Sequence, residues 1–192
     1  GRGDEPLTVM GAMSEDMTST ERSDVLVERF APEFGLVEPS EELILADESQ
    51  PEADRVVTKF QQVYQGIPVL GGELIVNASD QGELYSMNGE VSQGLTVDTT
   101  PTIKKEEAKT TALQIILRGL GGSPENFVVS EPELWVFDES LLKPSDRPAE
   151  LLWRIEVTSV DNSIPLRELV LVNADTGRVS LHFNQVDTAW TV

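Results

Sequence analysis

The chain has 192 residues, 39% of them hydrophobic, which is enough for one sizeable domain or two small ones. Its formal net charge of −20 would repel nucleic acid and anionic membranes, so neither is expected as a partner. The absence of cysteine excludes disulfides and thiol catalysis, and a single histidine, His182, excludes a zinc site of the His-Glu-x-x-His type.

The N-terminal part predicts a flexible lead-in followed by a helix. Residues 1–23 are rich in Gly, Ser, Thr, Asp and Glu, and they contain Arg2-Gly3-Asp4, an integrin-type triplet that arises easily by chance at a terminus. Residues 24–34 space their apolar side chains as an amphipathic helix does, and Gly35 is a natural stop. The next segment predicts a charged turn, a short strand and a loop, at 38–42, 43–46 and 47–54.

The clearest pattern in the chain is a β-hairpin centred on Gln65-Gly66-Ile67-Pro68. Upstream, the side chains of residues 56–64 alternate between two faces, as in a strand. Pro68 favours extended geometry at Ile67 and Gly66 can adopt a positive φ, so a second strand should begin at Val69. A third strand is expected at 83–91, which makes an antiparallel meander.

Gly71-Gly72 is an unusual feature of the second strand, because glycine in a strand costs roughly 0.5–1 kcal/mol relative to alanine. Two interpretations are open. The glycines can form a β-bulge or allow a helix to pack closely on the sheet, or they can belong to a contact surface for another protein. We favour the first.

The second half of the chain repeats this layout. After the linker Thr99-Thr100-Pro101, residues 103–120 have helical spacing, and Gly121-Gly122-Ser123-Pro124 ends the helix. A proline-rich loop is expected at 142–148, and strands are expected at 127–130, 133–137, 151–159, 166–173 and 178–184. The predicted fold class is therefore α+β, with two consecutive helix-plus-antiparallel-sheet units.

No catalytic site is predicted. Asp175-Thr176-Gly177 matches the triplet of aspartic proteases, but it occurs once and lies between two predicted strands, where a hairpin turn explains it. His182 falls in an alternating strand and is expected on its surface. The pairs Glu41-Glu42 and Glu106-Glu107 suit solvent and a helix start better than acid–base catalysis. No cofactor or metal is expected, and the chain is expected to be a monomer.

Two further kinds of residue have open interpretations. Trp135 and Trp153 lie in strand patterns and are predicted to be core, whereas Trp190 follows the last strand, where it is either inserted into a partner or disordered. Asn77-Ala78-Ser79 is a glycosylation sequon, and it would be used only in an organism that glycosylates secreted proteins.

The central motif Phe60-Gln61-Gln62-x-Tyr64-x-Gly66-Ile67-Pro68-Val69-x-Gly71-Gly72-Glu73-Leu74 resembles that of the fungalysin/thermolysin propeptide domain. The resemblance implies that its motif residues are structural: Phe60, Gln61, Gln62, Tyr64, Gly66, Ile67 and Pro68. Three positions depart from the family's usual residue. They are Lys59, often Arg; Asn77, often His; and Lys104, usually a helix-capping Ser.

The stretch 99–189 resembles a PepSY domain, the usual second half of thermolysin-family propeptides. The similarity rests on Thr102-Ile103-Lys104-Lys105-Glu106-Glu107-Ala108, Leu151-Leu152-Trp153-Arg154-Ile155-Glu156-Val157 and Val172-Asn173-Ala174-Asp175-Thr176-Gly177-Arg178-Val179. The resemblance implies a cystatin-like/PepSY-like fold with a lead-in, a propeptide-motif domain, a PepSY-like domain and a tail, at 1–23, 24–98, 99–189 and 190–192.

Together the resemblances imply the prosegment of a secreted thermolysin-like zinc metallopeptidase, acting as intramolecular chaperone and inhibitor of the catalytic domain. The partner is then that catalytic domain, which carries the zinc, and the chain itself is not an enzyme. Residues expected to contact the peptidase are Gly71, Gly72, Glu73, Asn184, Gln185, Val186, Asp187, Thr188, Ala189 and Trp190. The alternative is a free-standing secreted binding or protease-inhibitor module. A cell-surface adhesion module based on Arg2-Gly3-Asp4 is a third hypothesis.

Overall fold

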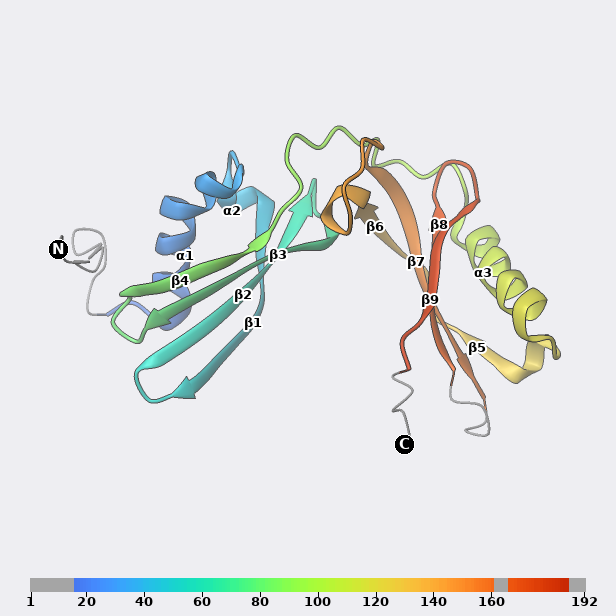
Figure 1. Cartoon of the computed structure of the whole chain (residues 1–192), viewed down its shortest axis with the longest axis horizontal. Coiled ribbons are helices and arrows are strands. Elements are labelled where there is room, and N and C mark those ends of the chain that lie inside the picture. The colour runs from blue at the N-terminus through green and yellow to red at the C-terminus, as the bar shows by residue number, and fades with distance from the viewer. Residues whose placement is uncertain (1–15, 161–165, 187–192) are drawn as a thin grey trace. The chain divides into compact units, whose positions relative to one another are not determined.

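A computed structural model describes residues 16–160 and 166–186, and its fold is α+β, as predicted (Figure 1). It consists of two compact units. The first ends at Leu95 and also takes in Asp138–Arg147, while the second contains Thr96–Phe137 and the chain from Pro148 onward. The inclusion of residues 138–147 in the first unit was not expected from the sequence. The segment Arg2-Gly3-Asp4 lies outside the described residues.

From residue 16 onward, the described part of the first unit starts with three short helices, α1 (Ser19–Phe30), η1 (Ala31–Phe34) and α2 (Pro39–Glu42). Helix α1 starts five residues earlier than predicted, so 19–23 are not part of a flexible lead-in. The reason is a capping box: Thr18 Oγ1 accepts from the Glu21 N–H at 3.2 Å, and Glu21 Oε2 accepts from the Thr18 N–H at 2.7 Å. The helical stretch ends at Gly35, whose φ of 94° confirms the predicted stop.

Four antiparallel strands follow as a meander, namely β1 (Leu43–Glu52), β2 (Arg55–Tyr64), β3 (Ile67–Ser79) and β4 (Leu84–Glu90). The predicted meander of β2, β3 and β4 is confirmed, but the predicted loop at 47–54 is mostly strand. In β1, Glu48 pairs with Thr58 and Ser49 with Val57, and the register slips on both sides of these pairs. Because most β1 side chains are exposed, no alternation marks it in the sequence.

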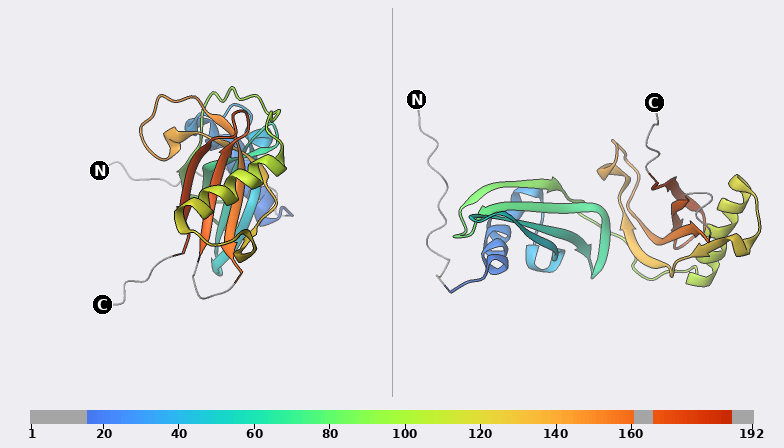
Figure 2. Two further views of the ribbon diagram at one scale, coloured as in Figure 1. Left: turned by 90° about the vertical axis from the view of Figure 1, so that its right-hand side faces the viewer. Right: turned by 90° about the horizontal axis from the view of Figure 1, so that it is seen from below.

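The core of the first unit lies between its helices and one face of its sheet (Figure 2, right). Phe60 and Leu74 from β2 and β3 pack in one cluster with Leu26 of α1. The buried hydroxyls of Ser23 and Thr58 hydrogen-bond at 2.8 Å, which satisfies both polar groups inside this layer.

The second unit contains one long helix and five antiparallel strands. The helix is α3 (Lys105–Leu120), and the strands are β5 (Phe127–Val129), β6 (Glu133–Phe137), β7 (Glu150–Ser159), β8 (Arg167–Asn173) and β9 (Val179–Asn184). Short 3-10 turns occur at η2 (Pro124–Asn126) and η3 (Glu139–Leu141), of which η3 belongs to the first unit. Central strand β7 pairs with β5 and β6 on one side and with β8 on the other, and β9 pairs with β8. All five strands match the predicted positions.

Helix α3 covers one face of this second sheet (Figure 2, left). Ala108, Ala112 and Ile116 are buried on the helix, and Trp153 of β7 donates its indole N–H to the Ile103 carbonyl at 2.8 Å. Trp153 is therefore core, as predicted. Lys104 occupies the N-cap without a side-chain hydrogen bond, as expected from the missing serine. None of the helices in the described part of the chain has the length and apolar character needed to cross a bilayer.

Candidate functional site

The hairpin at the centre of the sequence motif turns tightly at Gln65 and Gly66, which adopt φ values of 50° and 80°. Two positive φ values are typical of the type I′ turn that joins paired strands. The predicted reversal is therefore confirmed, although β3 begins at Ile67 rather than Val69. Pro68 lies inside β3, opposite Val63, and is not part of the turn.

A wide β-bulge interrupts the pairing just after this turn. Gln61 pairs with Glu73 and Val63 with Pro68, so Gln62 alone stands opposite residues 69–72 of β3. The Gln61 amide holds the bulge together, because its Nε2 donates to the carbonyls of Val69 at 2.7 Å and Gly72 at 2.9 Å. Gly71 has a φ of 81°, which favours glycine. The bulge interpretation of the glycine pair is confirmed.

Gln62 connects this bulge to the end of the sheet. Its side chain is 1% exposed. Its Nε2 donates to the Ser92 carbonyl at 2.7 Å and its Oε1 accepts from the Ser92 N–H at 2.8 Å. A Cβ on Gly72 would come within 2.5 Å of Gln62 Oε1, so only glycine fits without a shift. No pattern in the sequence indicates Ser92 as the partner of Gln62.

The glycine pair and Glu73 were expected to contact a peptidase, and the structure separates them. Gly72 is buried and is not available to a partner, which corrects that expectation. Gly71 is exposed, with Leu141 of η3 near the position a Cβ would take, at 3.9 Å. Glu73 is partly exposed and forms an ion pair with Lys59 at 2.8 Å. The first unit therefore offers Gly71 and Glu73 as surface residues.

The remaining motif residues lie in the two strands of the hairpin and in its turn. Phe60 is 3% exposed in the core. Tyr64 and Ile67 pair with each other on either side of the turn, and the Tyr64 hydroxyl accepts from Gln65 Nε2 at 3.2 Å.

Asp138 anchors residues 138–147 to the first unit. Ser92 Oγ donates to the Asp138 carboxylate, and Asp138 also caps η3 by accepting from the Ser140 N–H at 2.9 Å. Partial burial raises the pKa of Asp138, but the hydrogen bonds from Ser92 and Ser140 outweigh it, so the pKa lies below its ordinary value. Glu139 next to it accepts from Ser145 at 2.6 Å and pairs with Lys143 at 2.9 Å.

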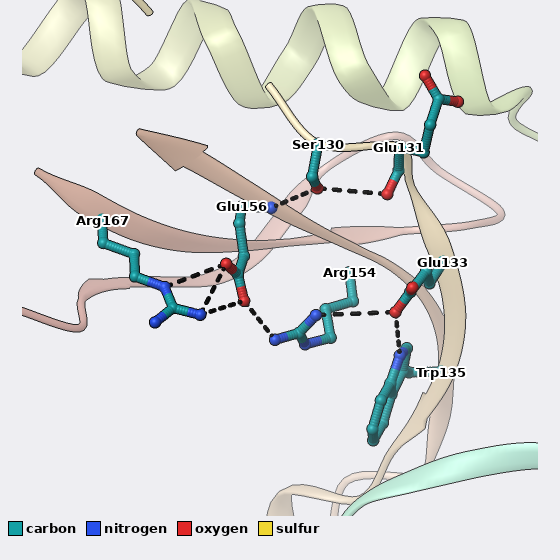
Figure 3. Close-up of polar contacts among 7 residues, drawn as sticks. All are labelled: Ser130, Glu131, Glu133, Trp135, Arg154, Glu156 and Arg167. Atoms are coloured by element: carbon teal, nitrogen blue, oxygen red, sulfur yellow. Dashed lines mark hydrogen bonds and ion pairs between the residues drawn. The ribbon is translucent and has the colours of Figure 1, made fainter. Parts of the chain in front are cut away.

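The face of the second sheet opposite α3 carries a row of charged and aromatic side chains, which we call the Arg154 cluster (Figure 3). Arg154 forms ion pairs with Glu156 at 2.6 Å and with Glu133 at 3.7 Å. Its guanidinium carbon lies 5.6 Å from the centre of the Trp135 ring. The cluster is completed by Arg167, which contacts Glu156 at 3.0 Å.

This cluster corrects one prediction. Trp135 was expected to be core, but it is only partly buried and lies on the open face beside Arg154 (Figure 3). The sequence contained one indication of this placement. Arg154 and Glu156 alternate with buried residues along β7, which indicates that one face of the sheet carries polar side chains. Partial burial raises the pKa of Glu156, but the hydrogen bonds and positive charges of Arg167 and Arg154 outweigh it, so the pKa is lowered.

The C-terminal residues expected to contact a peptidase begin at the end of β9. Asn184 ends the strand and is exposed. The Gln185 N–H donates to the Arg167 carbonyl at 2.7 Å, and the Val186 N–H donates to Asn184 Oδ1 at 2.9 Å, so the chain stays paired with β8 to this point. The other predicted contact residues, Asp187, Thr188, Ala189 and Trp190, lie outside the described residues.

The polar motifs for which a catalytic role was considered have structural explanations. Asn173 Oδ1 accepts from the backbone of Asp175 at 3.1 Å and Thr176 at 2.8 Å, which confirms a turn at Asp175-Thr176-Gly177. His182 lies on the surface of β9, as predicted, with Nδ1 3.5 Å from Glu168. Among residues 16–160 and 166–186, no three His, Cys, Asp or Glu side chains are grouped so that they could hold a metal ion.

The sequon asparagine is engaged within the first sheet. Asn77 lies near the end of β3, where its Oδ1 accepts from Arg55 at 2.9 Å and its Nδ2 donates to Ser86 at 3.2 Å. The side chain is partly buried between neighbouring strands.

Comparison with known proteins relates this geometry to a protein family. Residues 41–91, which contain the hairpin, the bulge and β4, match the Fungalysin/Thermolysin Propeptide Motif. The chain is 26% identical over 134 residues to bacillolysin of Bacillus cereus, covering 70% of this chain and 22% of that protein. It is 25% identical over 175 residues to bacillolysin of Bacillus amyloliquefaciens, covering 88% of this chain and 33% of the relative.

Similarity extends to other metalloproteases. The chain is 26% identical over 152 residues to thermolysin of Bacillus caldolyticus, covering 78% of this chain and 27% of the relative. The chain thus spans between about a fifth and a third of the length of these curated relatives. Among solved structures, the Bacillus megaterium YpeB C-terminal domain is similar at a TM-score of 0.43 and 16% identity, covering 90% of this chain and 67% of that one.

Proposed function

We propose that this chain is the prosegment of a secreted thermolysin-like zinc metallopeptidase, and that it assists folding of the catalytic domain and inhibits it until cleavage. The observation that carries the proposal is the propeptide-motif match at residues 41–91, which falls on the hairpin and on the glutamines that hold its bulge. The similarity to bacillolysins and thermolysin, which extend well beyond the matched region, supports the same assignment. In this proposal the zinc belongs to the peptidase.

The second unit is proposed to be the PepSY-like domain, over residues 99–189, following a propeptide-motif domain over 24–98. Its helix-first order and its single antiparallel sheet support the assignment. Helices cover one face of each sheet, and the other face of the second sheet carries the Arg154 cluster together with the buried Leu152, Leu169 and Leu171. Preformed sheets of this kind suit a template role, because little chain entropy is lost when a partner binds them.

The peptidase is proposed to contact the chain mainly through the segment that follows β9. The Gln185 N–H makes the last described bond to β8, and the segment after Val186 is proposed to be bound as an extended strand in a substrate groove. Proposed contact residues on the first unit are Gly71 and Glu73, both at the surface. On the second unit they are Asn184, Gln185, Val186, Asp187, Thr188, Ala189 and Trp190.

The direct test uses the chain as a separate protein, added to the catalytic domain encoded in the same gene. We expect it to inhibit peptide hydrolysis and to raise the yield of active enzyme when the denatured catalytic domain is refolded. An unrelated acidic protein of similar net charge controls for effects of charge alone. If no peptidase is encoded with the chain, or if neither effect occurs, the proposal fails and the free-standing binding module replaces it.

A further inference from the structure

Strand β9 is an edge strand whose backbone is half unpaired. It pairs only with β8 among the described strands. The Gln185 N–H faces β8, and the register places Phe183 opposite Leu169. Amide directions alternate along a strand, so the N–H and C=O groups of His182 and Asn184 face away from β8. No acceptor for these two N–H groups is found among the described residues.

This edge has few of the features that normally prevent another strand from adding to it, with one break in its register, between Val179 and Leu181. The segment Val179–Asn184 contains no Asp, Glu, Lys or Arg. By contrast, edge strand β1 carries Asp47, Glu48 and Glu52, contains Pro51 and has two breaks in its register. Edge strand β4 ends in Glu90 and is preceded by Glu83, while edge strand β5 is uncharged but has only three residues.

The side chains and charge around β9 suit an uncharged partner strand. Phe183 is 45% exposed and, from its register with Leu169 and Glu156, lies on the same face as the Arg154 cluster. Over residues 166–186 the formal charge is zero, from two basic residues (Arg167, Arg178) and two acidic ones (Glu168, Asp175). The whole chain carries −20, but this region has no net charge to attract a charged strand, which favours an uncharged one.

We propose that the outer edge of β9 accepts an extended, uncharged segment of the peptidase domain as an added antiparallel strand, with Phe183 packing against it. This inference rests on the proposed function and deepens it by assigning a second contact surface, separate from the segment after Val186. The bonds are made by the backbone of His182 and Asn184, and Phe183 selects for an apolar neighbour. Because the two contacts are continuous in the chain, the added strand would lie beside the segment bound in the groove.

The first experiment compares Phe183→Lys with Tyr85→Lys in inhibition of the peptidase. Tyr85 is the matched control, because it is an aromatic residue on edge strand β4 that is 52% exposed. A lysine on an edge opposes strand addition, so Phe183→Lys should weaken the inhibition constant at least about tenfold and Tyr85→Lys less than about twofold. Circular dichroism and cooperative melting confirm that both variants fold.

A second experiment uses the wild-type chain and measures amide hydrogen exchange with and without the peptidase. Exchange at His182 and Asn184 should slow at least about tenfold in the complex, while Leu181 and Phe183, already bonded to β8, serve as internal references. If the complex forms and His182 and Asn184 exchange unchanged, the inference is wrong while the proposed function stands. If wild type neither binds nor inhibits, both are wrong. A dimer of this chain that Phe183→Lys dissociates would also overturn the inference, since the occupant would be a second copy.

Discussion

Gly72 lies directly against the side chain of Gln62. A Cβ built on Gly72 would approach Gln62 Oε1 to 2.5 Å and Gln62 Cβ to 2.9 Å. Gln62 cannot move away freely, because both ends of its amide are bonded to the backbone of Ser92. A side chain at position 72 would therefore disturb the two hydrogen bonds by which Gln62 holds Ser92 after the end of β4.

The substitution Gly72→Ala should therefore destabilise the first unit. We expect a loss of about 1–3 kcal/mol in the free energy of unfolding, because the new methyl group either displaces the Gln62 amide or strains the bulge. Chemical denaturation measures it. Gly119→Ala is the control, since Gly119 lies in helix α3 with no atom within 4 Å of a built Cβ. The control should be stabilising by about 0.5–1 kcal/mol. Equal stability of wild type and Gly72→Ala would contradict the close packing.

Acid should remove the stabilisation given by Glu156. Its pKa is lowered in the folded chain, so the ionised carboxylate stabilises the fold above the pKa of the unfolded chain, about 4.3, and this contribution is lost as the pH falls through the folded value. At pH 7, Glu156→Gln should cost about 1–2 kcal/mol, because two arginines lose a charged acceptor.

The measurement for Glu156→Gln is denaturation of wild type and variant from pH 7 downward. Their stability difference should shrink below about pH 4.5. Glu125→Gln is the control, because Glu125 is exposed and has no ion pair among the described residues. It makes the same change in charge. A stability difference for Glu156→Gln that does not depend on pH would show that packing, rather than ionisation, causes it.

Removing metal ions should leave the fold unchanged. The described residues contain no group of three His, Cys, Asp or Glu side chains that could hold a metal, and both units have apolar cores. Adding EDTA to the purified chain should shift the melting temperature by less than about 1 °C. Sodium chloride added to the same ionic strength serves as the control for ionic effects. A clear fall in melting temperature with EDTA alone would reveal a structural metal.

Truncation should separate inhibition from folding. A chain ending at Val186 keeps the Gln185 bond to Arg167, which a chain ending at Phe183 would lose. It should melt as wild type does, while its inhibition of the peptidase should weaken at least about tenfold, or about 1.4 kcal/mol. Trp190→Ala tests whether one aromatic carries most of this loss. Undiminished inhibition by the truncated chain would move the main contact to β9 or to the surface at Gly71 and Glu73.

The sequence by itself determined the elements in which one face is buried and the other is not. Alternation along β2 and β7 and helical spacing along α3 follow from burial on one side, so these elements could be predicted nearly to the residue. The tight turn at Gly66 could be predicted for a local reason, its freedom to adopt a positive φ. The capping box at Thr18 and Glu21 follows a sequence pattern that predicts a helix start at this point, although the helix was expected to begin only at residue 24.

Only the tertiary structure decided the features that depend on partners distant in the chain. Most of β1 is exposed, so its strand character comes from backbone bonds to β2 and leaves no pattern in its side chains. Residues 138–147 join the first unit through Asp138 and Ser92, which are 46 positions apart. Trp135 lies on the Arg154 face because β6 pairs with β7 so that Glu133 is opposite Arg154, and alternation along β6 alone could not distinguish this position from a core one. Periodicity reports which face a residue occupies, while the neighbours across the sheet decide whether that face is covered.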